Sequence, residues 1–310
     1  MSNKKKKILL AVDGSGQSLN AVHYAGATFS TNNSEIVLFN ILAGTPETFL
    51  DLGKEAVFQS DVAAIGAWTT QVKQNIEQFM QNAKSVLTDA GFQADDIKIK
   101  IHMKKSGVTR DILEEADKGY DALVIGRTGI SKAKDILIGG IANKLIGKTA
   151  HPIVVVGGKP TPKRILIAFD GSKGSKRAVD CIASLVDRSG CRIRLCHVVR
   201  RLNFRLGSKV FFTPKQITEW LDEHTKEIRP VLKEMEKRLI KSGFSKEFID
   251  IEILDEQISR AYRIVSEARD CNYQTIVVGR RGLTIVEEFL MGRVSNKVLQ
   301  IATEMAVWIA

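Results

Sequence analysis

Cysteine is scarce in this 310-residue chain. No two cysteines form a Cys-x2-Cys pair, and no cysteine or histidine stands at the spacing of a zinc site, which argues against a disulfide framework and a structural zinc. A free cysteine usually behaves as a small buried hydrophobe, so we expect buried, reduced thiols. All four lie in the second half of the chain: Cys181, Cys191, Cys196 and Cys271.

Long hydrophobic runs are also missing. No apolar run approaches the ~18 residues that a membrane-spanning helix needs. Lys4–Lys7 followed by the apolar run Ile8–Val12 has the charge order of a signal peptide, but the run is short, ends at Asp13 and lacks a small-residue cleavage site. We interpret Ile8–Val12 as a buried first strand, and we expect a cytoplasmic protein with no membrane partner.

Positive charge is in excess but is not concentrated in one place. The net charge is +11, with 19 basic and 16 acidic residues in positions 1–160 and 27 basic and 19 acidic residues in positions 161–310. No nucleic-acid-binding motif accompanies this charge, so we do not expect nucleic acid as a partner. A basic surface with interleaved acids favours small anionic ligands.

The clearest feature that is present is an internal repeat. Ile8–Ser15 (ILLAVDGS) recurs as Ile165–Ser172 (ILIAFDGS), and Leu123–Gly129 (LVIGRTG) recurs as Ile276–Gly282 (IVVGRRG). A period this long indicates duplicated domains and not short solenoid repeats. A segment rich in glycine and proline separates the copies. We therefore predict domain one at 1–157, a linker at 158–162 and domain two at 163–310.

Within each copy, short apolar runs alternate with helical patterns. Several of the runs are continuously apolar, which is typical of strands that are buried on both faces of a parallel sheet. Helices between such strands predict right-handed βαβ crossovers and an α/β fold with two tandem, doubly wound, Rossmann-like domains. The expected strands are Ile8–Val12, Ile36–Leu42, Ile97–Met103, Ala122–Ile125 and Ile153–Val156, then Ile165–Phe169, Arg192–Val199, Phe248–Leu254, Thr275–Val278 and Ala306–Ile309.

A long helical segment follows the second strand of each copy. Trp68 lies in the first segment and Trp220 in the second, and we expect both to be packing aromatics of the core. Thr213 and Pro214 are a suitable N-cap and first helical residue for the second segment. Pro230 should bend that helix or divide it.

A glycine loop follows the fourth strand of each copy. The first glycine permits a sharp turn, the second permits close approach of a ligand to the backbone, and the third precedes a helix whose free amides can bind anions. This pattern predicts a phosphate cradle, and the alternative is that the glycines serve only loop turns. The loops are Gly126-x2-Gly129-x9-Gly139 and Gly279-x2-Gly282-x9-Gly292.

An aspartate ends the first strand of each copy, Asp13 in one and Asp170 in the other. Open α/β sheets bind ligands outside the carboxyl ends of their strands, so both carboxylates stand at the expected edge. The alternative is a capping role at the next helix, with Ser15 or Ser172 supplying the capping oxygen.

Catalytic patterns are not evident. No Ser-His-Asp ordering or paired carboxylates indicate hydrolysis. Gly147–Thr149 resembles the end of a Walker loop, but Ala142 stands where that motif needs glycine. We therefore predict no catalytic residue and no metal ligand. Any turnover would be limited to slow ATP hydrolysis or autophosphorylation.

Together, Asp13-Gly14-Ser15, the two glycine loops and the segment Val294–Val298 resemble the universal stress protein family over nearly the whole chain. The resemblance implies an adenine nucleotide alpha hydrolase-like sheet of order 3-2-1-4-5 in each domain. It also implies that the two last strands meet, so that the chain is an intramolecular pseudo-dimer that mimics the usual homodimer. A homodimer of the whole chain stays open.

Within the family, the glycine loop resembles that of the ATP-binding members, which implies ATP or AMP, with or without Mg²⁺, as the ligand. The aspartate and the apolar residue after the second strand would hold adenine and ribose, and the loop would hold the phosphates. The implied contacts are Ala11, Asp13, Ile41, Ile125, Gly126, Gly129, Gly139, Gly140 and Ile141 in domain one, and Ala168, Asp170, Val198, Val278, Gly279, Gly282, Gly292, Arg293, Val294 and Ser295 in domain two.

The chain departs from this pattern directly after the third glycine. The ATP-binding members have serine or threonine there, and this chain has Gly140 and Arg293. Arg293 either makes a bidentate phosphate contact or turns outward, and Ser295 keeps one hydroxyl in domain two. The sequence therefore predicts two unequal sites.

The leading hypothesis is a stress-response sensor or regulator that binds ATP or a related adenine nucleotide. The alternative is a nucleotide-independent scaffold for dimerisation or partner binding. A third hypothesis, a nucleotide-activating enzyme of similar fold, needs an acid or base that we cannot locate in the sequence.

Overall fold

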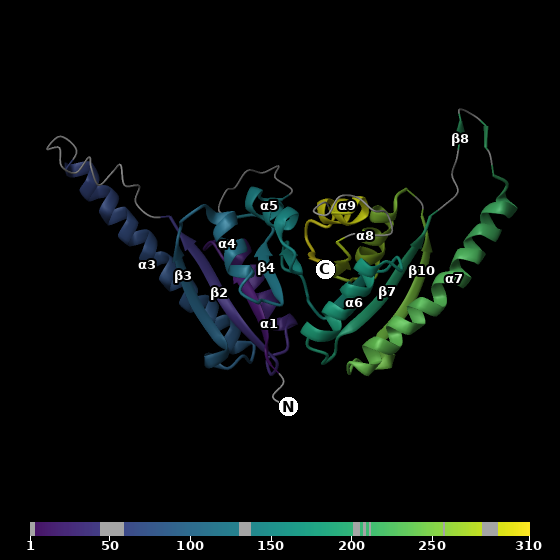
Figure 1. Ribbon diagram of the computed structural model, residues 1–310, viewed down its shortest axis with the longest axis horizontal. Coiled ribbons are helices and arrows are strands. Elements are labelled where there is room, and N and C mark those ends of the chain that lie inside the picture. The colour runs from purple at the N-terminus through teal and green to yellow at the C-terminus, as the bar shows by residue number, and fades with distance from the viewer. Residues whose placement is uncertain are drawn as a thin grey trace.

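The computed structural model describes residues 4–43, 59–129, 138–200, 205–206, 209–210, 212–256, 258–280 and 291–310. Two α/β units follow one another and share a single ten-stranded sheet (Figure 1). The tandem α/β fold predicted from the repeat is confirmed. All ten predicted strands are present, each within two residues of its expected ends.

The first unit contains five strands and four helices in the part of the chain that is described. In chain order they are β1 Lys6–Ala11, α1 Gly16–Thr28, β2 Ser34–Leu42, α3 Gln59–Asp89, β3 Ile97–Met103, α4 Val108–Ala116, β4 Ala122–Gly126, α5 Gly140–Lys148 and β5 Ile153–Val156. A 3-10 turn at Ala94–Asp96 leads into β3.

The second unit repeats this order. Its elements are β6 Arg164–Ala168, α6 Lys173–Leu185, β7 Arg192–Val199, α7 Pro214–Lys241, β10 Ile249–Asp255, α8 Arg260–Asp270, β11 Thr275–Val278, α9 Arg293–Ile301 and β12 Ala306–Ile309. A short antiparallel pair, β8 Arg205–Leu206 with β9 Lys209–Val210, precedes α7, and a 3-10 turn at Lys246–Phe248 precedes β10.

The strand order explains where a ligand can bind. It reads β10-β7-β6-β11-β12-β5-β4-β1-β2-β3, which is 3-2-1-4-5 within each unit. Neighbouring strands are parallel within each unit, so their carboxyl ends share one edge. The chain reverses its strand order between β1 and β4, and between β6 and β11. Such switch points open a crevice at the carboxyl edge.

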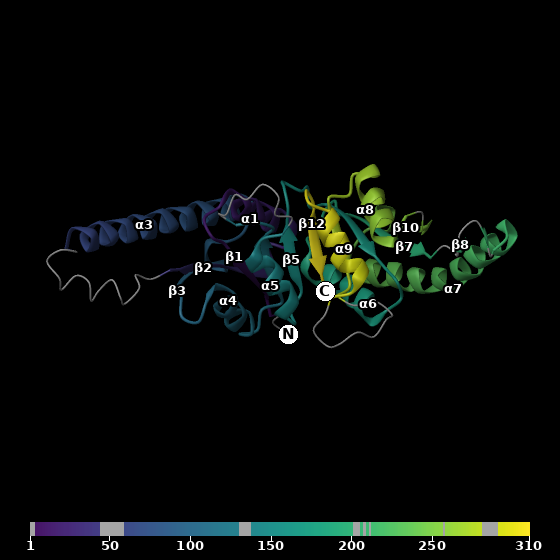
Figure 2. The same ribbon diagram turned by 90° about the horizontal axis from the view of Figure 1, so that it is seen from above.

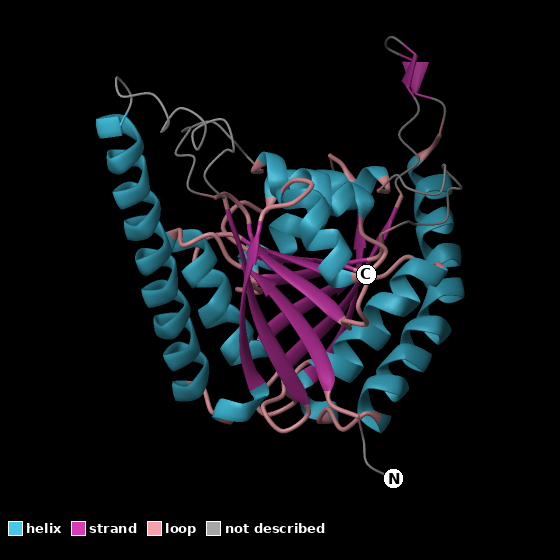
Figure 3. Cartoon of the chain, turned by 60° about the vertical axis from the view of Figure 1, so that its left-hand side comes forward, coloured by secondary structure: helices cyan, strands magenta, loops and turns pink. Residues whose placement is uncertain are grey.

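Two hydrophobic layers hold the helices on the sheet. Leu10, Leu38 and Val124 face α1 and α3, whereas Leu9, Phe39 and Leu123 face α4 and α5. The second unit is built in the same way, with α6 and α7 on one face and α8 and α9 on the other. Figure 3 shows helices on both sides of the sheet. Continuously apolar strands are needed because both faces are covered.

The two units join through their last strands. β12 and β5 pair antiparallel at the centre of the sheet (Figure 2). A buried polar group accompanies this pairing, since Trp308 Nε1 donates to the Tyr24 hydroxyl at 2.8 Å, and that hydroxyl lies 3.0 Å from Thr275 Oγ1. A Cβ on Gly157 would overlap the carbonyl oxygen of Thr303, so the residue directly before the predicted linker is tightly packed.

One expectation about the long helices is wrong. Trp68 is 68% exposed, because α3 extends beyond the strands that it covers. Pro230 lies inside α7 without dividing it. Proline has no amide hydrogen, so the carbonyl of Lys226 receives no helix hydrogen bond from position 230. Lys226 is exposed, so water can reach that carbonyl. The expected N-cap Thr213 is confirmed, with Gln216 completing a capping box.

The cysteines are free, as expected from the sequence. Three are buried, and Cys271 is half-buried. None of the described helices is long and apolar enough to cross a membrane.

Candidate functional site

The site begins where β1 ends. Asp13 Oδ1 accepts a hydrogen bond from the Ser15 amide at 3.0 Å, and Ser15 Oγ caps α1 by accepting from the Ser18 amide at 3.2 Å. Domain two repeats both bonds, at 3.0 Å to Asp170 Oδ1 and 3.1 Å to Ser172 Oγ. The serine is therefore the helix cap, and the aspartate braces the turn before it.

The first glycine of each loop is required by a helix. A Cβ on Gly126 would lie 3.2 Å from the Ser18 amide nitrogen, and a Cβ on Gly279 would lie 2.7 Å from the corresponding nitrogen of Ser175. Helices α1 and α6 thus pack directly on the ends of β4 and β11. The sequence predicted these glycines for a sharp turn, but close packing is what demands them.

The second glycine brings the loop to the aspartate. A Cβ on Gly129 would lie 2.5 Å from Asp13 Oδ2, so any larger residue would displace that carboxylate or the loop. The switch-point crevice therefore has the Asp13 carboxylate and the loop backbone side by side. The corresponding Gly282 lies outside the described residues.

The third glycine begins a helix. Gly139 is the N-cap of α5 and Gly292 is the N-cap of α9, and neither has a side chain that could cap the first turn. The Gly139 amide donates to Arg127 O at 2.9 Å and the Gly292 amide to Arg280 O at 2.8 Å, which fixes each helix start against its own loop. The amides of a first turn have no acceptor within the helix and can bind an anion.

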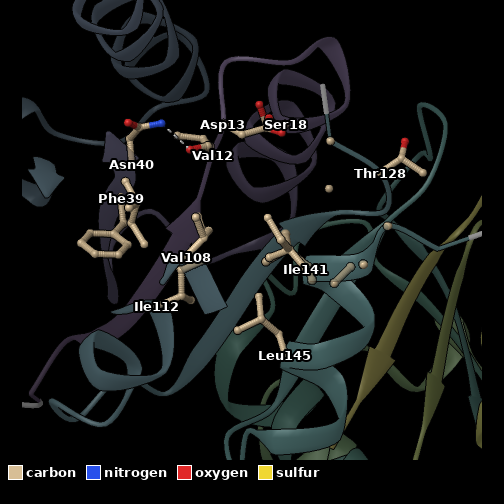
Figure 4. A pocket seen from close by; sticks show the side chains of 18 of the residues that line it. Val12, Asp13, Ser18, Phe39, Asn40, Val108, Ile112, Thr128, Ile141 and Leu145 are labelled. Atoms are coloured by element: carbon tan, nitrogen blue, oxygen red, sulfur yellow. Dashed lines mark hydrogen bonds between the residues drawn. The ribbon is translucent and has the colours of Figure 1, made fainter. Parts of the chain in front are cut away.

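These segments enclose a cavity of about 610 Å³ in domain one (Figure 4). Val108, Ile112, Ile141 and Leu145 project toward it from α4 and α5, and Asp13 lies at its opposite side (Figure 4). All nine residues predicted for domain one line this cavity: Ala11, Asp13, Ile41, Ile125, Gly126, Gly129, Gly139, Gly140 and Ile141.

Sequence reasoning missed the lining that the helices provide. Val72 and Ile76 come from α3, and Val108 and Ile112 come from the start of α4. Both pairs have the i, i+4 spacing of one helix face, but nothing in the sequence says which helix face reaches the crevice. Asn40 was also missed. Its Nδ2 donates to Val12 O at 2.8 Å and so ties β2 to the end of β1.

Domain two places its predicted residues at the equivalent edge. Ala168 and Val278 end β6 and β11, and Val198 is in β7. Gly279 directly follows β11, and Asp170 lies two residues after the end of β6. Ser295 is buried, and its hydroxyl donates to Gly279 O at 2.7 Å, so this hydroxyl fastens the loop to α9. Arg293 is exposed at the first position of α9, where Val294 follows it.

The family model of the universal stress protein family matches residues 5–157 and 161–308. The chain belongs to this family. It is 24% identical over 307 residues to a universal stress protein of Mycolicibacterium smegmatis, covering 96% of this chain and 94% of that protein. A universal stress protein of Bacillus subtilis is 27% identical over 143 residues, 45% of this chain and 93% of its own.

A solved structure has the same tandem arrangement. The universal stress protein from Archaeoglobus fulgidus aligns with a TM-score of 0.63 at 17% identity, covering 98% of this chain and 97% of its own. This likeness supports the fold of both units together.

In this universal stress protein, each loop also reaches into the other domain. Arg127 is buried, and its guanidinium donates to Leu299 O at 2.9 Å and Ala302 O at 2.7 Å, at the end of α9. Arg280 donates in return to Ile146 O at 2.6 Å and His151 O at 3.1 Å, at and beyond the last turn of α5. Each guanidinium lies at the negative end of the helix whose positive end begins the other site.

Charge around the domain-one cavity is modest. Asp13 and Lys144 are its acidic and basic lining residues apart from Arg127. Among the described residues, no group of three or more histidine, cysteine, aspartate or glutamate side chains could hold a metal ion. The arrangement is suited to binding, and Asp13 is the acidic side chain of the described lining that lies next to the loop.

Proposed function

We propose that this universal stress protein binds ATP or a related adenine nucleotide and acts in the cytoplasm as a stress-response sensor or regulator. One observation carries the proposal. Segments from five different parts of domain one, to which the family resemblance assigned the nucleotide contacts, converge on a single cavity. Its volume of about 610 Å³ lies in the range of small-molecule sites.

The lining divides into parts that match the parts of a nucleotide. Ile41, Ile125 and Val108 provide an apolar wall for an adenine ring. Asp13 provides a carboxylate that can accept from ribose hydroxyls, and the α5 amides after Gly139 provide donors for phosphate oxygens. Because Gly129 has no side chain, the loop backbone lies close to Asp13 and can contact the nucleotide as well.

The proposed role is binding and not turnover. Asp13 is already braced by the Ser15 amide, and no described histidine lines the domain-one cavity. A change in nucleotide concentration would therefore change the fraction of protein that has nucleotide bound. A bound nucleotide contacts the loop, α4 and α5 at once, which makes their relative position sensitive to occupancy.

We further propose that the two domains stand in for the two subunits of a dimer. The antiparallel pairing of β5 with β12 and the reciprocal contacts of Arg127 and Arg280 relate the domains in a two-fold manner. The pairing also removes two sheet edges from solvent.

Calorimetric titration with ATP and AMP tests the proposal. The wild-type chain should bind at least one adenine nucleotide, and Asp13→Ala should weaken binding to domain one by about tenfold or more, since a charge-assisted hydrogen bond is lost. Asp170→Ala reports on domain two in the same way. Absence of heat with both nucleotides would contradict the proposal and favour the nucleotide-independent scaffold.

A further inference from the structure

Three positions at the carboxyl edge of domain two differ chemically from domain one, in addition to the Gly140 and Arg293 pair. Asn40, Val72 and Val108 line the cavity of domain one. The equivalent residues in domain two are His197, His224 and Arg260. Two neutral aliphatic side chains and an amide are thus replaced by two imidazoles and a guanidinium.

The structure fixes these equivalences. Ala11 pairs with Phe39, and Ala168 pairs with Cys196, so Asn40 and His197 are each the next residue along their strands. On the long helices, Ile76 lies against Gly14 and Ile228 lies against Gly171. Val72 and His224 come one turn before these isoleucines, and Val108 and Arg260 are the first residues of α4 and α8.

His197 replaces Asn40 in the same contact. Its Nδ1 lies 2.7 Å from Phe169 O, as Asn40 Nδ2 lies 2.8 Å from Val12 O. A carbonyl oxygen can only accept, so Nδ1 keeps its proton and Nε2 is the atom that titrates. Nε2 has no hydrogen-bond partner among the residues that the structure describes.

His224 is held in the same tautomer from the other side. Its Nδ1 lies 2.9 Å from Trp220 O, and its ring lies against the Trp220 indole with centroids 3.6 Å apart. Trp220 Nε1 donates to Arg200 O at 3.0 Å, which ties this part of α7 to the end of β7. In both imidazoles a backbone carbonyl therefore fixes Nδ1 as the donor.

The groups that act on His197 come from every side of the crevice. Burial is the main cause that lowers the pKa of His197, and the charges of Arg260 and His224 lower it further. The Phe169 carbonyl and Asp170 oppose this effect. In the absence of a ligand, positive charge from α7 and α8 thus disfavours a second proton on the His197 ring.

Resting on the proposed nucleotide function, we infer that domain two holds a proton-linked anion site at the place where domain one has the apolar wall around Val108. An anion placed among His197, His224 and Arg260 neutralises their mutual repulsion and allows the imidazoles to become cations. Domain one, with Asn40 and Val72 in these places, should bind without this proton uptake. The larger excess of basic residues in positions 161–310 agrees with an anionic ligand there.

The sign of the pH dependence follows from linkage. Protonated imidazoles favour the anion, so affinity should rise as pH falls from 8 to 6. Each proton taken up on binding changes affinity by up to about tenfold per pH unit. The fixed charge of Arg260 adds affinity that does not change over this range.

The test uses tripolyphosphate and ATP as separate probes. Calorimetry of the full chain at pH 6, 7 and 8, in buffers with different ionisation enthalpies, gives both affinity and protons taken up. The matched variant combines His197→Asn with His224→Val. At these two positions domain two then has the side chains that domain one has at Asn40 and Val72. The ligand's own protonation is common to both proteins, so the difference between them reports on the imidazoles.

We expect wild type to bind tripolyphosphate about tenfold more tightly at pH 6 than the double variant, with little difference between the two at pH 8. Proton uptake should fall in the variant, and thermal unfolding verifies that it remains folded. Equal pH profiles for the two proteins, or no tripolyphosphate binding by wild type, would overturn the inference.

The probes separate this inference from the proposed function. If ATP binds with the same pH profile to wild type and to the variant, the proposed nucleotide function is supported and the proton-linked site is contradicted. Proton-linked binding of tripolyphosphate without any binding of ATP or AMP supports the anion site and contradicts the nucleotide function. A reciprocal variant, Asn40→His with Val72→His, should introduce proton uptake into domain one.

Discussion

At the residue scale, the site depends on how closely two backbones approach. Gly129 lies against the Asp13 carboxylate, and Gly126 lies against the start of α1. Gly140, one position into α5, has open space where a side chain would stand. These glycines therefore differ in how much space a side chain would have, and the spacing in the sequence does not show this difference.

Gly129→Ala should weaken ATP binding in domain one by about tenfold or more, because the new Cβ meets Asp13 Oδ2 and displaces a ligand-facing carboxylate. Gly147→Ala is the matched control, since Gly147 lies in α5 outside the cavity lining and its Cβ would meet nothing within 4 Å. Calorimetric titration of both variants makes the comparison. Equal affinities for the two variants would mean that the loop does not contact the nucleotide.

Glu115 offers a second prediction at this scale. Burial alone would raise the pKa of this side chain, but hydrogen bonds from Lys100, Lys118 and Tyr120 outweigh burial and lower the pKa to about 2. A carboxylate with a lowered pKa stabilises the fold above its unfolded pKa, and that stability is lost as pH falls from about 4.5 to about 2.

Glu115→Gln should therefore lower the free energy of unfolding at pH 7 by about 2 kcal/mol. Denaturant unfolding at pH 7, 4 and 3 measures the difference between variant and wild type. The gap should narrow steadily toward pH 3. A constant gap over this range would mean that the Glu115 charge adds nothing to stability.

At the element scale, each helix beside the site begins in a way that the sequence could reveal only in part. Ser15 and Ser172 cap α1 and α6, as the capping interpretation of the pattern Asp-Gly-Ser expected, but that pattern left open whether the aspartate has a role of its own. The structure divides the work between them. The serine hydroxyl satisfies the helix, and the aspartate satisfies the turn through the serine amide.

Ser15→Ala should cost about 1 kcal/mol of stability, as loss of an N-cap usually does. It should leave ATP affinity within about twofold, because Asp13 still accepts from the backbone amide of residue 15. Thermal unfolding and calorimetry on the same sample give both values. A tenfold loss of affinity would show that the cap, and not only the aspartate, shapes the site.

The length of α3 explains why the predicted burial of Trp68 is wrong. The 31 residues of α3 span about 46 Å at 1.5 Å per residue, whereas the nine residues of β2 span about 30 Å. The half that contains Trp68 therefore extends past the strands. Periodicity predicts the length and apolar face of a helix. It does not predict where the helix extends beyond the strands on which it packs.

At the scale of the whole molecule, the two domains are joined by one continuous sheet and by two reciprocal arginines. The repeat and the ten strands could be predicted, because apolar runs and glycine spacing are local features, and the family resemblance supplied nine of the residues that line the domain-one cavity. The contacts of Arg127 and Arg280 could not be predicted, because their acceptors are backbone carbonyls more than 120 positions away. Backbone acceptors leave no signature in a sequence.

Arg127→Met should lower the free energy of unfolding by about 2 kcal/mol or more, since Leu299 O and Ala302 O each lose a charged donor in a buried place. Arg280→Met is the matched variant and should cost less, because Arg280 is only half-buried. Denaturant unfolding measures both. A larger loss for Arg280→Met would contradict this account of the domain contact.

The central claim is that the carboxyl edge of domain one holds an adenine nucleotide. A crystal structure of the full chain grown with ATP tests it most directly. We predict density for the nucleotide in the cavity bounded by Asp13 and Ile141, with its phosphates at the start of α5 and its base against the apolar wall of Ile41 and Ile125. ATP-saturated crystals in which this cavity holds only solvent would contradict the account.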